Sequence, residues 1–100
     1  NKNLDQIMDN IPNYHMIKEK IKIPDINVSL FYNYLSNIYA ETKKDTTDGL
    51  KLLWKDKWLH IRSSNTEPVI RVIAESSNLE TTKGLIKSTI NQLRKYCIEN

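Results

Sequence analysis

Apolar residues recur along the chain at two different periods, and the change of period divides it into predicted helices and strands. Residues 14–23 alternate isoleucines with lysines, which predicts a strand with one buried side. Residues 24–38 carry apolar side chains at helical spacing, and Asp25 stands where a carboxylate caps a helix or stabilises its positive end. The predicted buried face of this helix consists of Ile26, Leu30, Phe31, Tyr34, Leu35 and Ile38.

From Lys44 onward apolar and polar residues alternate, which predicts a series of strands joined by short turns. Asp48-Gly49 is a turn signal, and Lys55-Asp56-Lys57 has the composition of a hairpin loop. Ile61 and Val72 fall on the apolar side of their strands, so we expect both to be buried under the helices. The expected strands are residues 44–47, 50–54, 58–62 and 69–75.

The residues after Asn78 return to helical spacing, and Asn78 is placed to cap this closing helix. Its predicted buried stripe consists of Leu85, Ile86, Ile90, Leu93 and Cys97. The order β-α-β-β-β-β-α predicts an α+β domain, an antiparallel sheet with helices packed on one face. Residues 3–11 have helical spacing that Pro12 ends, so we expect residues 1–12 to be a short helical lead-in or interdomain segment. Residues 13–100 are then the domain itself.

Composition excludes several classes of protein. One hundred residues make one domain, and no apolar run approaches the roughly 20 residues of a membrane span. The net charge is +3, with lysines scattered along the sequence. We interpret most of them as a solvated surface, short of the dense basic face that nucleic-acid binding needs. The lone Cys97 excludes an intramolecular disulfide framework and fits a reducing compartment, so we expect the cytoplasm.

The loop between the last two predicted strands holds the candidate chemistry, because residues 62–67 are all polar. Hydroxyls, an amide and a guanidinium supply many donors, and a tight turn also exposes backbone N–H groups to an anion. A phosphate group matches such a donor set. The same composition is also typical of an ordinary polar hairpin. The candidate phosphate-binding residues are Arg62, Ser64, Asn65 and Thr66, with Arg71 added if its strand faces the same side.

The segment Arg62-Ser63-Ser64-Asn65-Thr66-Glu67-Pro68 resembles the phosphate-binding signature of the α-D-phosphohexomutases. The likeness continues in Asp48-Gly49-Leu50 before the hairpin and in the strands on both sides of the loop, and it covers roughly residues 12–96. It implies the fourth, C-terminal domain of that family, with a TATA-box-binding-protein-like fold. Ser63 stands where Pro is frequent, and Asn65 stands where glucosamine-phosphate members usually carry Gly. The second departure favours the phosphomannomutase/phosphoglucomutase branch.

The resemblance also implies a mechanism for a larger enzyme. Members of the family are isomerases that interconvert hexose 1-phosphates and 6-phosphates through a bisphosphorylated sugar. The other three domains carry a phosphoserine, a Mg²⁺ held by aspartates and a sugar-reading loop, and this sequence has none of them. By the same likeness the loop at residues 62–66 clamps the phosphate that is not transferred. We therefore expect the fragment to be inactive by itself, with a hexose phosphate and the other domains as its partners.

Other residues and other functions remain compatible with the sequence. His60 shares a strand face with Arg62 and suits either proton transfer or a simple strand position. Glu67 is interpreted as structural, and Trp54 and Trp58 as packing residues. The alternative functions are a free-standing module that binds phosphorylated ligands or nucleic acid on its sheet, and a structural domain that mediates subunit contacts.

Overall fold

The predicted order of strands and helices is present in the computed structural model, which describes residues 14–64 and 66–99. The expected helical lead-in at residues 1–12 lies outside the described residues. Strand boundaries differ from the predicted ones by one or two residues. The elements are β1 (His15–Lys22), α2 (Val28–Ile38), β2 (Lys43–Asp45), β3 (Leu50–Leu53), β4 (Lys57–Ser63), β5 (Val69–Ser76) and α3 (Leu79–Glu99).

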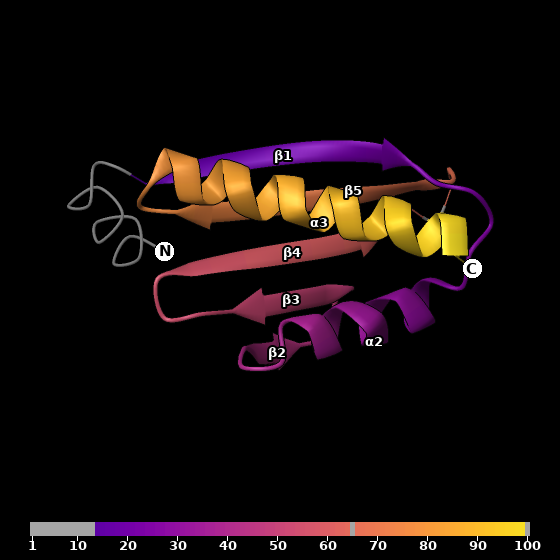
Figure 1. The fold of residues 1–100 in the computed structure, drawn as a ribbon, viewed down its shortest axis with the longest axis horizontal. Helices are drawn as coiled ribbons and strands as arrows, with labels where there is room; N and C mark the ends of the chain where they lie inside the picture. Colours follow the sequence, from indigo (N-terminus) through magenta and orange to yellow (C-terminus); the bar gives the residue numbers. More distant parts are fainter. Residues whose placement is uncertain (1–13, 65, 100) are drawn as a thin grey trace.

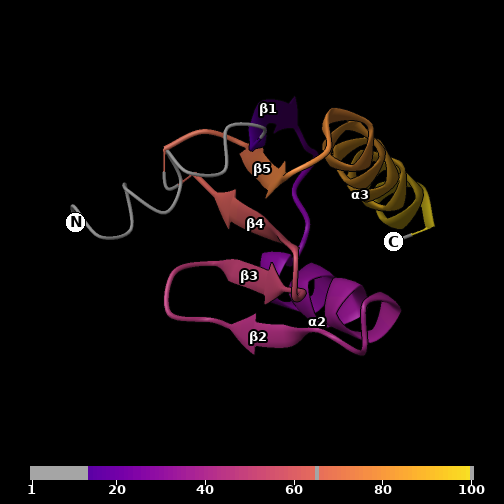
Figure 2. The same ribbon diagram turned by 90° about the vertical axis from the view of Figure 1, so that its left-hand side faces the viewer.

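The five strands form one antiparallel sheet in the order β1-β5-β4-β3-β2. Strands β2 to β5 follow one another as hairpin neighbours, whereas β1 pairs with β5 at the far edge (Figure 1). Helices α2 and α3 both cover the same face of the sheet, and no helix of the described residues covers the opposite face (Figure 2). The described residues therefore form the expected α+β domain with its helices on one face.

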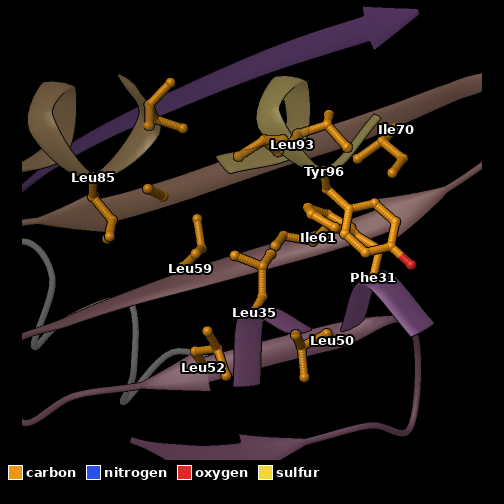
Figure 3. Close-up of a cluster of buried hydrophobic side chains, with 13 residues drawn as sticks. Phe31, Leu35, Leu50, Leu52, Leu59, Ile61, Ile70, Leu85, Leu93 and Tyr96 are labelled. Atoms are coloured by element: carbon orange, nitrogen blue, oxygen red, sulfur yellow. The ribbon is translucent and has the colours of Figure 1, made fainter. Parts of the chain in front are cut away.

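The core fills the space between this sheet face and the two helices. Ile61 and Val72 pair across β4 and β5, and both are fully buried, as the alternation predicts. Phe31 and Leu35, one helical turn apart on α2, are fully buried against the same layer (Figure 3). Burying such side chains contributes roughly 1.5–3 kcal/mol each, so this layer fixes which way every strand faces.

Helix α2 begins later than the sequence predicts. The expected cap, Asp25, precedes the helix, and the N-cap is Asn27, whose Oδ1 accepts a hydrogen bond from the Leu30 backbone N–H at 3.1 Å. The segment after Pro24 remains non-helical up to this cap. Leu30 and Ile38 were predicted to be buried, which is wrong. They are 55% and 40% exposed, because they fall to either side of the stripe formed by Phe31 and Leu35.

Helix α3 begins as predicted, with the Asn78 side chain accepting a hydrogen bond from the Thr81 N–H at 3.1 Å. Its buried stripe is more polar than expected, because Thr82 and Thr89 are fully buried among the apolar residues. The Thr89 hydroxyl donates to the Leu85 carbonyl at 2.8 Å, so a buried polar atom is satisfied within the helix itself. Cys97, expected in the buried stripe, is only partly buried.

Candidate functional site

The register of β4 and β5 decides where the candidate arginines lie. Arg62 and Arg71 are direct cross-strand partners. Their neighbours Ile61 and Val72 face the helices, so the alternation of side chains turns both arginines toward the helix-free face. The condition set for including Arg71 is therefore met. Two guanidinium groups emerge side by side at the end of β4 where the polar loop begins.

A cavity of about 350 Å³ opens beside these arginines. It lies between the end of β4, the start of the loop and the turn before β3. From the helix side it is reached by Tyr32, whose hydroxyl accepts a hydrogen bond from the Ser63 backbone N–H at 3.2 Å. The cavity is lined by Tyr32, Asp48, Gly49, Arg62, Ser63, Ser64 and Arg71.

Ser64 organises the loop through its hydroxyl. Its Oγ accepts hydrogen bonds from the backbone N–H groups of Thr66 at 3.2 Å and Glu67 at 3.3 Å. The backbone N–H of Ser64 donates to the Val69 carbonyl at 3.1 Å, which closes the turn. Both lone pairs of the hydroxyl oxygen accept hydrogen bonds from within the loop. The hydroxyl hydrogen can therefore be donated either to the Thr66 hydroxyl, 3.3 Å away, or to a ligand. Asn65, the remaining predicted ligand, lies outside the described residues.

The exit of the loop is fastened to β1. The Lys20 ammonium lies 3.6 Å from the Glu67 carboxylate, and the Ile23 backbone N–H donates to the Pro68 carbonyl at 2.8 Å. Glu67 is thus placed as the structural residue it was interpreted to be, and its ion pair joins the loop to a strand. These contacts join the end of the loop to the edge of the sheet formed by β1.

Arg62 is held from the opposite side by the turn before β3. Its Nε lies 3.3 Å from the Oδ1 of Asp48. Gly49 follows with φ +74°, and a side chain there would collide with the backbone carbonyl of Ile61, so this turn packs directly on β4. His60 Nε2 lies 2.7 Å from the Asp48 carbonyl oxygen, which suits an N–H donor and gives this histidine a structural contact.

Asp48 and Tyr32 are the residues that sequence reasoning missed. Asp48 was interpreted as part of a turn signal and of the family-like segment before the hairpin, without a contact to Arg62. Nothing in a helical tyrosine pointed to a loop 31 positions later. The same turn contains Asp45, whose carboxylate accepts a hydrogen bond from the Thr47 backbone N–H at 3.0 Å. Hydrogen bonds from the backbone and side chain of Thr47 lower the pKa of Asp45. Desolvation opposes this shift, and the charges of Lys51 and His60 add to it.

The helix-free face carries more ordered positive charge than the sequence spacing suggested. Lys20 pairs with Arg71, and Arg71 pairs with Arg62, so three cations from three strands form one row across the sheet. We call this set, Lys20, Arg71 and Arg62, the cationic row. Strand pairing gathers these three side chains although they are far apart in sequence, and two of them, Lys20 and Arg62, lie about half exposed beside the carboxylates of Glu67 and Asp48.

The described residues contain neither a metal-ligand cluster nor a membrane-spanning helix. Within residues 14–64 and 66–99 no group of three or more His, Cys, Asp or Glu side chains is arranged to hold a metal ion. None of the described helices is both long and apolar enough to cross a membrane.

The described residues thus form an α+β domain with two paired arginines beside a polar loop that a serine hydroxyl organises. The family model described as phosphoglucomutase/phosphomannomutase, C-terminal domain, matches residues 18–92, which include both arginines and the whole loop. The chain belongs to this family, and the resemblance drawn from its sequence is confirmed.

Similar curated proteins are sugar-phosphate mutases. The chain is 32% identical to a phosphoglucosamine/phosphogalactosamine mutase of Sulfurisphaera tokodaii over 90% of its length and 20% of the relative. It is 33% identical to a phosphoglucosamine mutase of Methanocaldococcus jannaschii over 95% of its length and 22% of the relative. Identity to a phosphoglucomutase/phosphomannomutase of Thermococcus kodakarensis is 27%, over 94% of this chain and 21% of the relative. The chain thus spans about a fifth of the length of these relatives.

Proposed function

We propose that this chain is the phosphate-binding C-terminal domain of a phosphohexomutase, an isomerase that interconverts hexose 1-phosphates and 6-phosphates through a bisphosphorylated sugar. Its loop at residues 62–66 clamps the phosphate that is not being transferred, with Arg71 as an additional contact. The observation that carries this proposal is the pairing of Arg62 with Arg71 on the helix-free face, beside the cavity and within the family match.

The donors around the cavity suit a dianionic phosphate. Hydrogen bonds that involve a charged group contribute about 1.5–3 kcal/mol each, so two guanidinium groups and a few loop donors are enough to hold a sugar phosphate in water. Thr66, the free hydrogen of the Ser64 hydroxyl and the amide of Asn65 are the loop donors of this proposal. The loop is already closed by its internal hydrogen bonds, so little ordering is required when a ligand enters.

Clamping through phosphate alone explains how one site serves both ends of the sugar. The bisphosphorylated intermediate must turn over so that its other phosphate meets the serine, which has given up its own phosphoryl group and takes up this one. Arg62 and Arg71 contact the phosphate and not the ring hydroxyls, so the clamp accepts the sugar in either orientation. The domain then contributes positioning and electrostatic stabilisation, whereas bonds are made elsewhere.

Three other domains of the same enzyme complete the site in this proposal. They supply the phosphoserine, the sugar-reading loop and a Mg²⁺ held by aspartates, which neutralises charge on the transferring phosphoryl group. The TATA-box-binding-protein-like fold type fits the observed order of strands and helices. We place the enzyme in the cytoplasm, where a lone thiol such as Cys97 stays reduced.

The substrate class is the hexose phosphates, with amino sugars included. Phosphoglucosamine appears in the names of the relatives with 32% and 33% identity, whereas the relative with 27% identity is named for glucose and mannose phosphates. The preference for the phosphomannomutase/phosphoglucomutase branch, drawn from the sequence, rested on Asn65 alone. Since the clamp reads phosphate, a side-by-side assay of glucosamine, glucose and mannose 1-phosphates in the complete enzyme is the direct way to assign the sugar.

The experiment that tests the clamp is substitution of Arg62 in the complete enzyme. Arg62→Lys keeps the charge and loses the planar fork, and Arg62→Ala loses both. We expect each to reduce kcat/KM at least tenfold, about 1.4 kcal/mol, with an unchanged Tm. Arg71→Ala should show a smaller reduction, and the isolated chain should show no turnover.

Arg94→Ala is the matched control, because Arg94 is an exposed arginine on α3, on the opposite side of the sheet. It should leave kcat/KM unchanged. The proposal fails if Arg62→Ala retains full kcat/KM, or loses it only by unfolding the domain. Binding of nucleic acid that weakens steeply with salt and ignores sugar phosphates would instead assign the cationic row to the alternative module.

A further inference from the structure

An arginine offers two edges to a bidentate partner, and in this structure one of them is engaged. The guanidinium can present either Nε with one terminal nitrogen, or the two terminal nitrogens Nη1 and Nη2. The Nε of Arg62 lies 3.3 Å from the Asp48 carboxylate. The edge formed by Nη1 and Nη2 does not include Nε, so a phosphate can bind there without displacing the Asp48 carboxylate from that atom.

The backbone of Asp48 is held by its surroundings, so its carboxylate meets Arg62 from a fixed point of the chain. The Asp48 carbonyl is bound by His60 at 2.7 Å, and the next residue, Gly49, packs against the backbone of Ile61 and Arg62. The turn is thus attached to β4 on both sides of Ile61. A flexible side chain such as arginine loses rotamer entropy when it is ordered, so a partner that already restricts it reduces the entropy that phosphate binding must overcome.

We propose that Asp48 is a positioning residue, whose carboxylate holds the Nε of Arg62 and thereby orients the Nη1/Nη2 edge toward phosphate. This inference rests on the proposed function of the loop as a phosphate clamp. Two opposing effects meet in the same side chain, because the carboxylate orients the arginine and also repels a phosphate through its charge. The pair is about half exposed, at 52% and 59%, so the expected effects are small in size and best separated by a cycle of variants.

The test is a titration of the ¹⁵N-labelled chain with inorganic phosphate at constant ionic strength, followed by amide shifts of the loop. We expect Asp48→Ala to weaken phosphate binding about two- to fivefold. Asp48→Asn, which keeps a side-chain oxygen for the Nε–H, should retain more than half of the wild-type affinity. Asp56→Ala is the matched control, since Asp56 is an exposed aspartate in the hairpin at the opposite end of β4, and it should have no effect.

The decisive comparison repeats Asp48→Ala in the Arg62→Lys background. Lysine has no Nε edge to orient, so removing Asp48 there should not weaken binding and should tighten it slightly by removing a negative charge. If Asp48→Ala weakened phosphate binding equally in both backgrounds, Asp48 would act only by maintaining the turn. If it tightened phosphate binding in both, Asp48 would act only by repelling the phosphate. Either result overturns the inference while phosphate binding by the loop stands. Absence of saturable loop shifts in the wild-type chain would contradict the proposed function itself, and the inference with it.

Discussion

Replacing Gly49 by alanine should destabilise this domain, whereas the same replacement at its other glycine should stabilise it. Gly49 has φ +74°, and a Cβ built there collides with the Ile61 carbonyl oxygen and lies 3.2 Å from the Cα of Arg62. Gly84 lies within α3, is exposed, and a Cβ built there meets nothing within 4 Å. One substitution therefore tests two opposite local environments.

The expected magnitude at Gly49 is the sum of three effects. Left-handed backbone costs a residue with a side chain roughly 1–2 kcal/mol. The collision with a backbone oxygen must be relieved by moving the turn, which weakens the hydrogen bond between His60 and the Asp48 carbonyl. The lower entropy of the unfolded chain offsets only about 0.4–1 kcal/mol. The backbone cost less the entropy offset leaves about 1 kcal/mol, and the collision adds to it, so we expect Gly49→Ala to lose more than about 1 kcal/mol and Gly84→Ala to gain about 0.8–1 kcal/mol.

Urea denaturation followed by circular dichroism measures both changes, provided that the m-value stays constant across the variants. Gly49→Ala should also weaken phosphate binding, because the displaced turn carries Asp48 away from Arg62. The reasoning is refuted if Gly49→Ala lies within about half a kcal/mol of wild type, or if Gly84→Ala destabilises the chain. The first result would mean that the turn is not packed on β4 as the structure has it.

Two further predictions concern the core and the loss of stability at low pH. Ile61→Ala removes a fully buried side chain and should cost about 2–4 kcal/mol by denaturant titration, and a loss below about half a kcal/mol would contradict the facing of β4. Hydrogen bonds from Thr47 hold the pKa of Asp45 below its ordinary value of 3.8, so its stabilising contribution is complete above that value and is lost as pH falls through the lower folded pKa. NMR titration of Asp45 should show this lowered pKa, and Thr47→Ala, which removes the hydroxyl and keeps the backbone N–H, should raise it in part; an unchanged pKa in that variant would show that the Thr47 side chain is not a cause.

Strand and helix order were readable from the sequence because they depend on local periodicity. Alternation placed Ile61 and Val72 on the buried side, and the Asn78 cap preceded a long helical repeat, as the structure has them. The polar loop was found the same way, since its residues are contiguous. The predicted start of α2 was wrong because Asp25 and Asn27 are both residue types that cap helices. The choice between these two caps depends on how Phe31 and Leu35 pack on the sheet.

What the tertiary structure alone decided is which distant residues share the site. Strand register brings Lys20, Arg62 and Arg71 into one row, although no sequence period relates them. The pairing of β3 with β4 brings the Asp48 turn onto Arg62, and α2 brings Tyr32 to the end of β4. Periodicity along one segment reports only which side of that segment is apolar. Pairing between segments is a non-local choice, fixed when the whole core packs, so the charges on the free face become neighbours only in the folded chain.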